Sequence, residues 1–136
     1  SIEKAKYFAD LIKQQDDFEL ISEPELCLLT YRYLPEEVKA FLPSANEEQR
    51  RSINTLLDSL TKFIQKRQRE SGKSFVSRTR IEVQKYDGKK VLVFRVVLAN
   101  PLTSKEILAD VLTEQREIAK ESKQYVPHLV KLVTSK

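Results

Sequence analysis

The sequence of 136 residues is poor in several residue types, and each shortage excludes a class of protein. A single cysteine, Cys27, rules out an internal disulfide and a metal site built from cysteines. A single histidine, His128, leaves no histidine-rich metal cluster and no Ser–His–Asp set. The two glycines, Gly72 and Gly88, cannot form a phosphate-cradling loop. We therefore expect no metal site and no nucleophilic triad.

Long apolar runs and methionine are also absent. No segment approaches the ~20 apolar residues of a membrane span, and the N-terminal segment lacks the apolar core of a signal peptide. These absences predict a cytoplasmic protein with no membrane partner. The sequence holds no initiator methionine, and Ser1 already lies within an amphipathic pattern. Both features favour a piece cut from a longer chain.

Charge is plentiful and mixed. Lys and Arg number 24 and Asp and Glu number 20, which gives a net charge of +4. Because the two signs are interspersed, this is the pattern of a solvated surface and not of a nucleic-acid-binding tail. Hydrophobic residues make up 40% of the chain, enough for one globular core in a single domain of this length.

Apolar spacing and turn residues predict an α+β domain, an antiparallel β-sheet with helices packed on it. Asn46 and Gln49 have the spacing of a capping box at the start of a long helix, and Asp87-Gly88 is a strong hairpin signal. Thr103 with Glu106 is expected to cap a later helix. The expected helices are 2–12, a turn within 35–42, 46–72 and 103–118, and the expected strands are 18–21, 26–33, 74–85 and 89–99, with a turn at 23–25.

We divide the single domain, residues 1–136, into a leading helix (1–15), an α+β core (16–122) and a tail (123–136). The tail contains Pro127 and a group of apolar residues. It reads either as a short helix or as an exposed edge that needs a partner. An interaction domain that dimerises through this tail is therefore one possible function.

Arg95 is the residue that stands out. It interrupts strand 89–99, which is otherwise apolar on both faces and so has the pattern of a central, covered strand. A buried guanidinium is costly unless an anion meets it, so Arg95 is a candidate clamp for a carboxylate or phosphate. The alternatives are an internal salt bridge or a strand register that points Arg95 outward.

Three other arginines suggest a different class of function. Arg78 and Arg80 share a face of strand 74–85, and Arg32 lies between two tyrosines. A sheet face bearing these residues would suit a stand-alone binding module for nucleic acid or an acidic protein. The glycine-bearing motif of an RNA-recognition strand is missing, however, so sheet packing accounts better for Arg32. A solvated sheet face, or stems that cover a helix, accounts better for Arg78 and Arg80.

Several short motifs, taken together, resemble one known domain. It is the small C-terminal domain of the group II pyridoxal-phosphate-dependent amino-acid decarboxylases, which are fold-type I enzymes. The resemblance covers about residues 7–118. The matching segments are Phe18-Glu19-Leu20, Pro24-Glu25-Leu26, Tyr31-Arg32-Tyr33, Asn46 before the long helix, Phe75-Val76-Ser77-Arg78-Thr79 and, most specifically, Phe94-Arg95-Val96-Val97-Leu98-Ala99-Asn100-Pro101.

The resemblance implies part of a lyase that releases the α-carboxylate of an amino acid as carbon dioxide, with pyridoxal 5'-phosphate as cofactor. It implies a large cofactor-binding domain in the same chain, and a homodimer at full length. In the family the imine lysine lies in that large domain. His128 is followed by Leu129 and not by a lysine, so this chain alone is expected to be inactive and to hold no cofactor-binding residue.

Arg95 is the one site residue that the resemblance carries over. It matches the small-domain arginine that pairs with a substrate carboxylate in glutamate decarboxylases. An acidic substrate, glutamate or aspartate, is therefore favoured, and diaminobutyrate is the other substrate expected from the resemblance.

Overall fold

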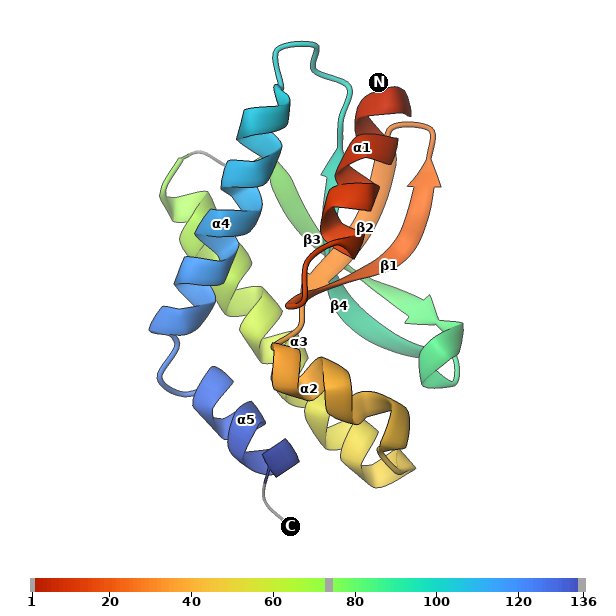
Figure 1. The fold of residues 1–136 in the computed structure, drawn as a ribbon, viewed down its shortest axis with the longest axis vertical. Helices are drawn as coiled ribbons and strands as arrows, with labels where there is room; N and C mark the ends of the chain where they lie inside the picture. Colours follow the sequence, from red (N-terminus) through yellow and green to blue (C-terminus); the bar gives the residue numbers. More distant parts are fainter. Residues whose placement is uncertain (1, 73–74, 135–136) are drawn as a thin grey trace.

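The computed structural model describes residues 2–72 and 75–134. One four-stranded antiparallel sheet carries helices on a single face (Figure 1). The elements are α1 (Ile2–Lys13), β1 (Phe18–Glu25), β2 (Leu28–Tyr33), α2 (Glu36–Phe41), the 3-10 turn η1 (Leu42–Ser44), α3 (Glu47–Glu70), β3 (Val76–Val83), the 3-10 turn η2 (Gln84–Tyr86), β4 (Lys89–Val97), α4 (Lys105–Glu121) and α5 (Val126–Thr134).

The strand order is β1-β2-β4-β3, so β2 and β4 are central and β1 and β3 are edges. Helices α1, α3 and α4 cover one face, where aromatic rings of the sheet and of α1 meet. The Tyr31 ring lies 5.5 Å from the Phe8 ring and 5.2 Å from the Phe94 ring. This main core buries the apolar stripes of the helices. Among the described residues no helix lies across the other face of the sheet (Figure 1), although Asn54 of α3 reaches Arg32 on that face.

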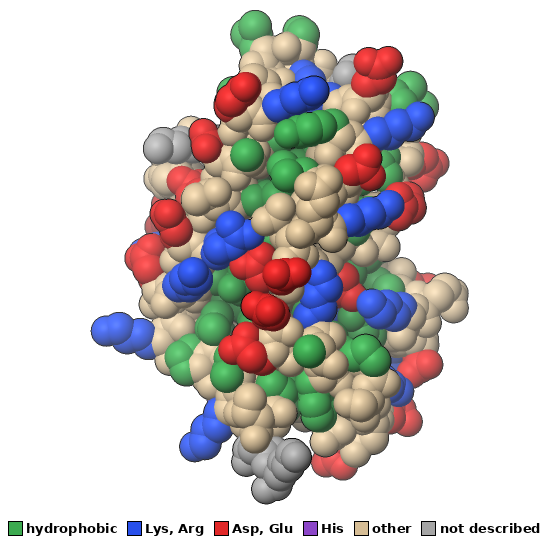
Figure 2. All heavy atoms as spheres, viewed as in Figure 1, with side chains coloured by type: hydrophobic (Ala, Val, Ile, Leu, Met, Phe, Trp, Pro, Cys, Tyr) green, Lys and Arg blue, Asp and Glu red, His purple; other side chains and the backbone are tan. Residues whose placement is uncertain are grey.

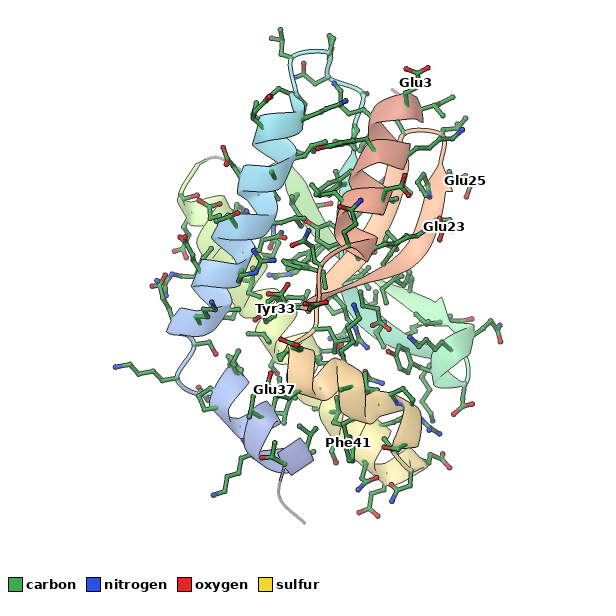
Figure 3. All side chains as sticks on the ribbon, in the orientation of Figure 1. Glu3, Glu23, Glu25, Tyr33, Glu37 and Phe41 are labelled. Carbon is green, nitrogen blue, oxygen red and sulfur yellow. The ribbon has the colours of Figure 1, made fainter. Side chains whose placement is uncertain are left out.

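Edge strand β1 carries features that discourage pairing with another sheet. Glu23 and Glu25 are exposed on either side of Pro24, and Figure 3 shows both carboxylates at the outer margin of the strand. Charged side chains and a proline on an edge strand hinder the addition of a further strand. The margin of β1 is therefore protected against edge-to-edge association.

The long helix α3 begins and ends as its sequence predicts. Asn46 accepts a hydrogen bond from the Gln49 backbone N–H at 2.8 Å, and the Gln49 side chain accepts one from the Asn46 N–H at 2.9 Å. This reciprocal pair satisfies two donors that a helix start otherwise leaves free. After Ser71 caps the helix, Gly72 has a φ of 76°, a conformation that glycine adopts without steric cost.

Three predicted boundaries are wrong. The strand predicted over 74–85 ends at Val83, where the 3-10 turn η2 begins, and its predicted start at residue 74 lies outside the described residues. The β1–β2 turn falls at Leu26 and Cys27, not at residues 23–25, because β1 continues through Pro24 as an edge strand. The cap of α4 is Ser104, which accepts from the Ile107 N–H at 3.2 Å, and not Thr103. Thr103 is buried instead.

The tail forms a helix. Helix α5 packs against α2 and α3, and its Leu129 side chain is fully buried in the main core. An exposed edge is therefore excluded for residues 126–134, and the apolar residues of the tail serve the chain's own core. None of the helices in the described part of the chain combines the length and apolar character needed to span a bilayer.

Candidate substrate-binding face of the sheet

The two faces of β4 have different surroundings. Phe94 and Val96 point into the main core under the helices. Val91 and Val93 point the other way and, with Tyr86, form a smaller apolar cluster on the helix-free face. Because side chains alternate along a strand, Arg95 and Val97 belong to that second face. The helix-free face is therefore apolar near the β3–β4 hairpin and open further along β4.

Arg95 lies in this open part, exposed to solvent. Its cross-strand partners are Thr30 on β2 and Ser77 on β3. The Thr30 and Ser22 hydroxyl oxygens are 2.6 Å apart, and the Ser77 hydroxyl donates to the Arg95 carbonyl at 3.3 Å. Within residues 2–72 and 75–134, no carboxylate forms an ion pair with the Arg95 guanidinium. The side chain is an exposed cation whose cross-strand neighbours carry hydroxyl groups.

Of the alternatives stated for Arg95, the structure shows the one in which the strand points it outward, and the pattern of a strand covered on both faces is wrong at this position. The smaller apolar cluster covers β4 only as far as Val93, and the register turns Arg95 outward beyond it. An exposed guanidinium needs no internal counterion, so the burial argument for a bound anion does not hold. What remains from the structure is an arginine that is accessible and has no ion pair within the described part of the chain.

The arginine that the fold does bury is Arg32, on the same face of the sheet. Its side chain is fully buried, and its Nε donates to Glu19 Oε1 at 2.8 Å. Its Nη1 donates to Asn54 Oδ1 at 3.0 Å, and the guanidinium lies 4.9 Å from the Tyr86 ring centre. Glu19 and Arg32 are cross-strand partners in β1 and β2. Their opposite charges, one on each strand, are the one sequence signal that points to this pair.

The Glu19 carboxylate is held in its charged form. Burial alone raises the pKa of Glu19, but the Arg32 charge and hydrogen bonds from Lys85 and Tyr86 outweigh it and lower the pKa below its usual 4.5. The Lys85 ammonium donates at 2.9 Å and the Tyr86 hydroxyl at 2.7 Å, both to Oε2. Both oxygens of Glu19 are thus fully engaged.

Arg78 and Arg80 share a face, as their spacing predicts, but it is the face covered by α3. Arg78 Nη1 donates to Gln65 Oε1 at 3.1 Å, and Arg80 Nη1 donates to Asp58 Oδ2 at 3.0 Å. Since Arg32 is buried on the opposite face, the three arginines form no common docking surface. Figure 2 shows both signs of charge interspersed over the face that carries α1, α2 and α4.

The other chemically reactive side chains are dispersed. His128 is exposed on α5, and Cys27 is half-buried in the β1–β2 turn. Among the described residues, no three His, Cys, Asp or Glu side chains gather closely enough to hold a metal ion. A pyridoxal phosphate site needs a lysine for the imine and an acidic partner for the pyridine nitrogen. The cross-strand neighbours of Arg95 are hydroxyl residues, so they do not by themselves fit that cofactor.

Solved structures of decarboxylases share this fold. The chain matches the glutamate decarboxylase domain of a diaminobutyrate-pyruvate transaminase and L-2,4-diaminobutyrate decarboxylase from Vibrio parahaemolyticus (TM-score 0.63, 22% identity, 88% of this chain and 21% of that one). It also matches mouse CSAD (TM-score 0.67, 20% identity, 86% and 22%) and Oryza sativa TDC with PLP and tryptamine (TM-score 0.60, 21% identity, 88% and 22%). The predicted fold class is confirmed: an α+β small domain of the kind found in pyridoxal-phosphate decarboxylases.

A protein of much higher sequence identity is also a decarboxylase. The chain is 65% identical over 133 residues to aspartate 1-decarboxylase of Aliivibrio fischeri, a match that covers 98% of this chain. The chain spans about a quarter of the length of that relative, 24%, and about a fifth of the length of the solved neighbours. No family model matches the chain.

Proposed function

We propose that this chain is the small domain of a pyridoxal-phosphate-dependent amino-acid decarboxylase that acts on aspartate. The observation that carries the proposal is the 65% identity to an aspartate 1-decarboxylase along nearly the whole chain. The cofactor assignment draws on the fold shared with a decarboxylase solved with PLP. The domain occupies a similar share of both kinds of protein, 24% of the relative and 22% of that neighbour.

Arg95 is the residue of this chain that we assign to the substrate. It is exposed, forms no ion pair with the residues that the structure describes and is set among hydroxyl groups, and it lies in the segment that most resembles glutamate decarboxylases. Its guanidinium presents two parallel N–H donors, which match the two oxygens of a carboxylate. In this role Arg95 holds the side-chain carboxylate of aspartate and so orients the α-carboxylate that leaves. The cofactor, held outside this chain, supplies the electron sink.

The open end of the sheet suits contact with the rest of such an enzyme. Val97, two residues after Arg95 on the same face, is 41% exposed, and Leu26 and Leu102 are 72% and 82% exposed. The β1–β2 turn and the β4–α4 loop that carry the two leucines lie at the same end of the molecule (Figure 1). Apolar side chains grouped in this way are typical of an interface. We assign this end to the large cofactor-binding domain and expect a homodimer at full length.

The test is made on the full-length parent protein. Its visible absorbance is recorded with pyridoxal phosphate, and carbon dioxide release is then measured from aspartate, glutamate and diaminobutyrate in turn. We expect an imine band and release from aspartate. Carbon dioxide release from glutamate alone, or from diaminobutyrate alone, would show that this amino acid and not aspartate is the substrate. Carbon dioxide release from aspartate without the imine band would show that the cofactor is not pyridoxal phosphate but another carbonyl electron sink, such as a pyruvoyl group.

A further inference from the structure

A second candidate site lies at the end of the sheet opposite Arg95, where helical elements meet the β3–β4 hairpin. A pocket of about 270 Å³ opens between α2, η1, the first turns of α3 and the β3–β4 hairpin. The lining combines three cations, a carboxylate, a tyrosine and an apolar wall: Lys39, Arg50, Lys85, Glu19, Tyr86, Leu34, Leu42 and Pro43.

The cations of the pocket are only partly neutralised. Glu19 is its one carboxylate, and that group is already occupied by Arg32, Lys85 and Tyr86. Arg50 approaches Asp87 only at 3.7 Å, and the Asp87 side chain is 66% exposed. Lys39 donates to two backbone carbonyls, which are dipoles and leave its charge unpaired. The pocket therefore retains excess positive charge.

A second observation concerns Arg32, which does not itself line the pocket but contacts two residues that do. Arg32 contacts both Glu19 and Tyr86, which line the pocket, and it is fully buried. Its Nη2 is the one buried side-chain nitrogen or oxygen without a hydrogen-bond partner among the described residues. A buried N–H group left unpaired is costly, and native proteins keep few of them. An anion in the pocket would add negative charge close to this guanidinium.

We propose that this pocket binds the phosphate group of a small phosphate monoester. Two lysines and one arginine that reach a common site from α2, α3 and η2 suit a compact dianion better than a single carboxylate. The proposal does not rest on the decarboxylase assignment. Arg95 lies six residues along β4 from Lys89 at the hairpin, which is roughly 20 Å at the usual rise per residue. The phosphate site and the substrate site are thus separate.

The probe is glycerol 3-phosphate, titrated calorimetrically into the full-length parent protein after saturation with pyridoxal phosphate and removal of the excess. Glycerol is the uncharged control ligand. We expect saturable binding of glycerol 3-phosphate only, weakened about tenfold or more by Arg50→Gln and by Lys39→Gln, because each loses a charged donor. Lys66→Gln removes an exposed cation from the same helix outside the pocket and should leave the affinity within about twofold.

Three outcomes would overturn the proposal. They are no saturable binding of glycerol 3-phosphate, equal binding of glycerol, or an equal loss of affinity in Lys66→Gln and Arg50→Gln. Thermal unfolding of each variant, compared with wild type, shows that the fold is retained. Arg50→Lys keeps the charge but loses the paired donors, and we expect it to bind between wild type and Arg50→Gln. Because none of these readouts needs turnover, failure here is distinct from failure of the proposed activity.

Discussion

Two arginines on one face of the sheet have opposite environments. Arg32 is fully buried with Glu19, whereas Arg95 is exposed with no ion pair among the described residues. From sequence, Arg95 looked like the buried member, because apolar residues flank it on its strand. The alternation of side chains along β4 could be predicted from the sequence. How much of that face the smaller apolar cluster covers could not, because it depends on tertiary packing. The chemistry of each arginine therefore follows from its coverage by other elements and not from its neighbours in sequence.

Removing the Glu19 carboxylate tests the buried pair. Glu19→Gln leaves the Arg32 charge buried without its counterion, and we expect a loss of about 3–5 kcal/mol in the free energy of unfolding near neutral pH. Urea unfolding of wild type and variant measures the difference. Glu23→Gln, which removes the exposed partner of Lys13, is the matched control and should cost less than about 1 kcal/mol.

The same pair predicts a pH dependence. Since folding lowers the pKa of Glu19 below 4.5, the stabilisation is fully present above that pH. It is lost as the pH falls through the lower pKa of the folded state. Wild-type unfolding free energy should therefore decline below about pH 4.5 more steeply than that of Glu19→Gln. Parallel acid curves for the two proteins would contradict the assignment of a lowered pKa to Glu19.

At the scale of helices and strands, the sequence predicted correctly those features that depend on residues close together in the chain. The capping box of α3 involves residues three apart, and the hairpin before β4 has Asp87 and Gly88 in the left-handed conformation, with φ of 59° and 73°. Both features could be predicted. The fate of the tail could not, because an apolar segment of that length suits a helix or an edge strand equally. Its helical form depends on packing against α2 and α3.

The α3 cap supports a quantitative prediction. Asn46→Ala removes the acceptor for the Gln49 N–H and should cost about 1 kcal/mol of unfolding free energy. Ser52→Ala changes an exposed residue within the same helix to a better helix former and should change stability by less than about 0.5 kcal/mol. Thermal and urea unfolding of the two variants make the comparison. Equal effects would show that the cap is not formed.

Helix α5 supports another prediction. Leu129→Ala opens a cavity in the main core and should cost about 2–5 kcal/mol, whereas exposed His128→Ala should change stability by less than about 0.5 kcal/mol. If the tail were instead a dimerisation element, Leu129→Ala would alter the molecular mass in solution before it altered unfolding. Urea unfolding together with light scattering separates the two effects.

At the scale of the whole molecule, one sheet separates two kinds of surface. The helix side holds the main core and the other side holds exposed Arg95, while the basic pocket lies at the hairpin end of the sheet, between the hairpin and α2, η1 and α3. The fold class could be predicted because element order and resemblance agree. The chain spans about a quarter of the length of its aspartate 1-decarboxylase relative, so the substrate and the cofactor belong to the proposed function.

The measurement that tests the central claim most directly is kcat/KM for aspartate in the full-length parent protein carrying Arg95→Ala. The account predicts a loss of at least about 100-fold, roughly 2.7 kcal/mol of transition-state stabilisation, with the cofactor absorbance retained. Arg80→Ala, which removes an arginine from the helix-covered face, is the matched control and should keep kcat/KM within about threefold. A value for Arg95→Ala equal to that of the Arg80→Ala control would contradict the assignment of Arg95 to the substrate.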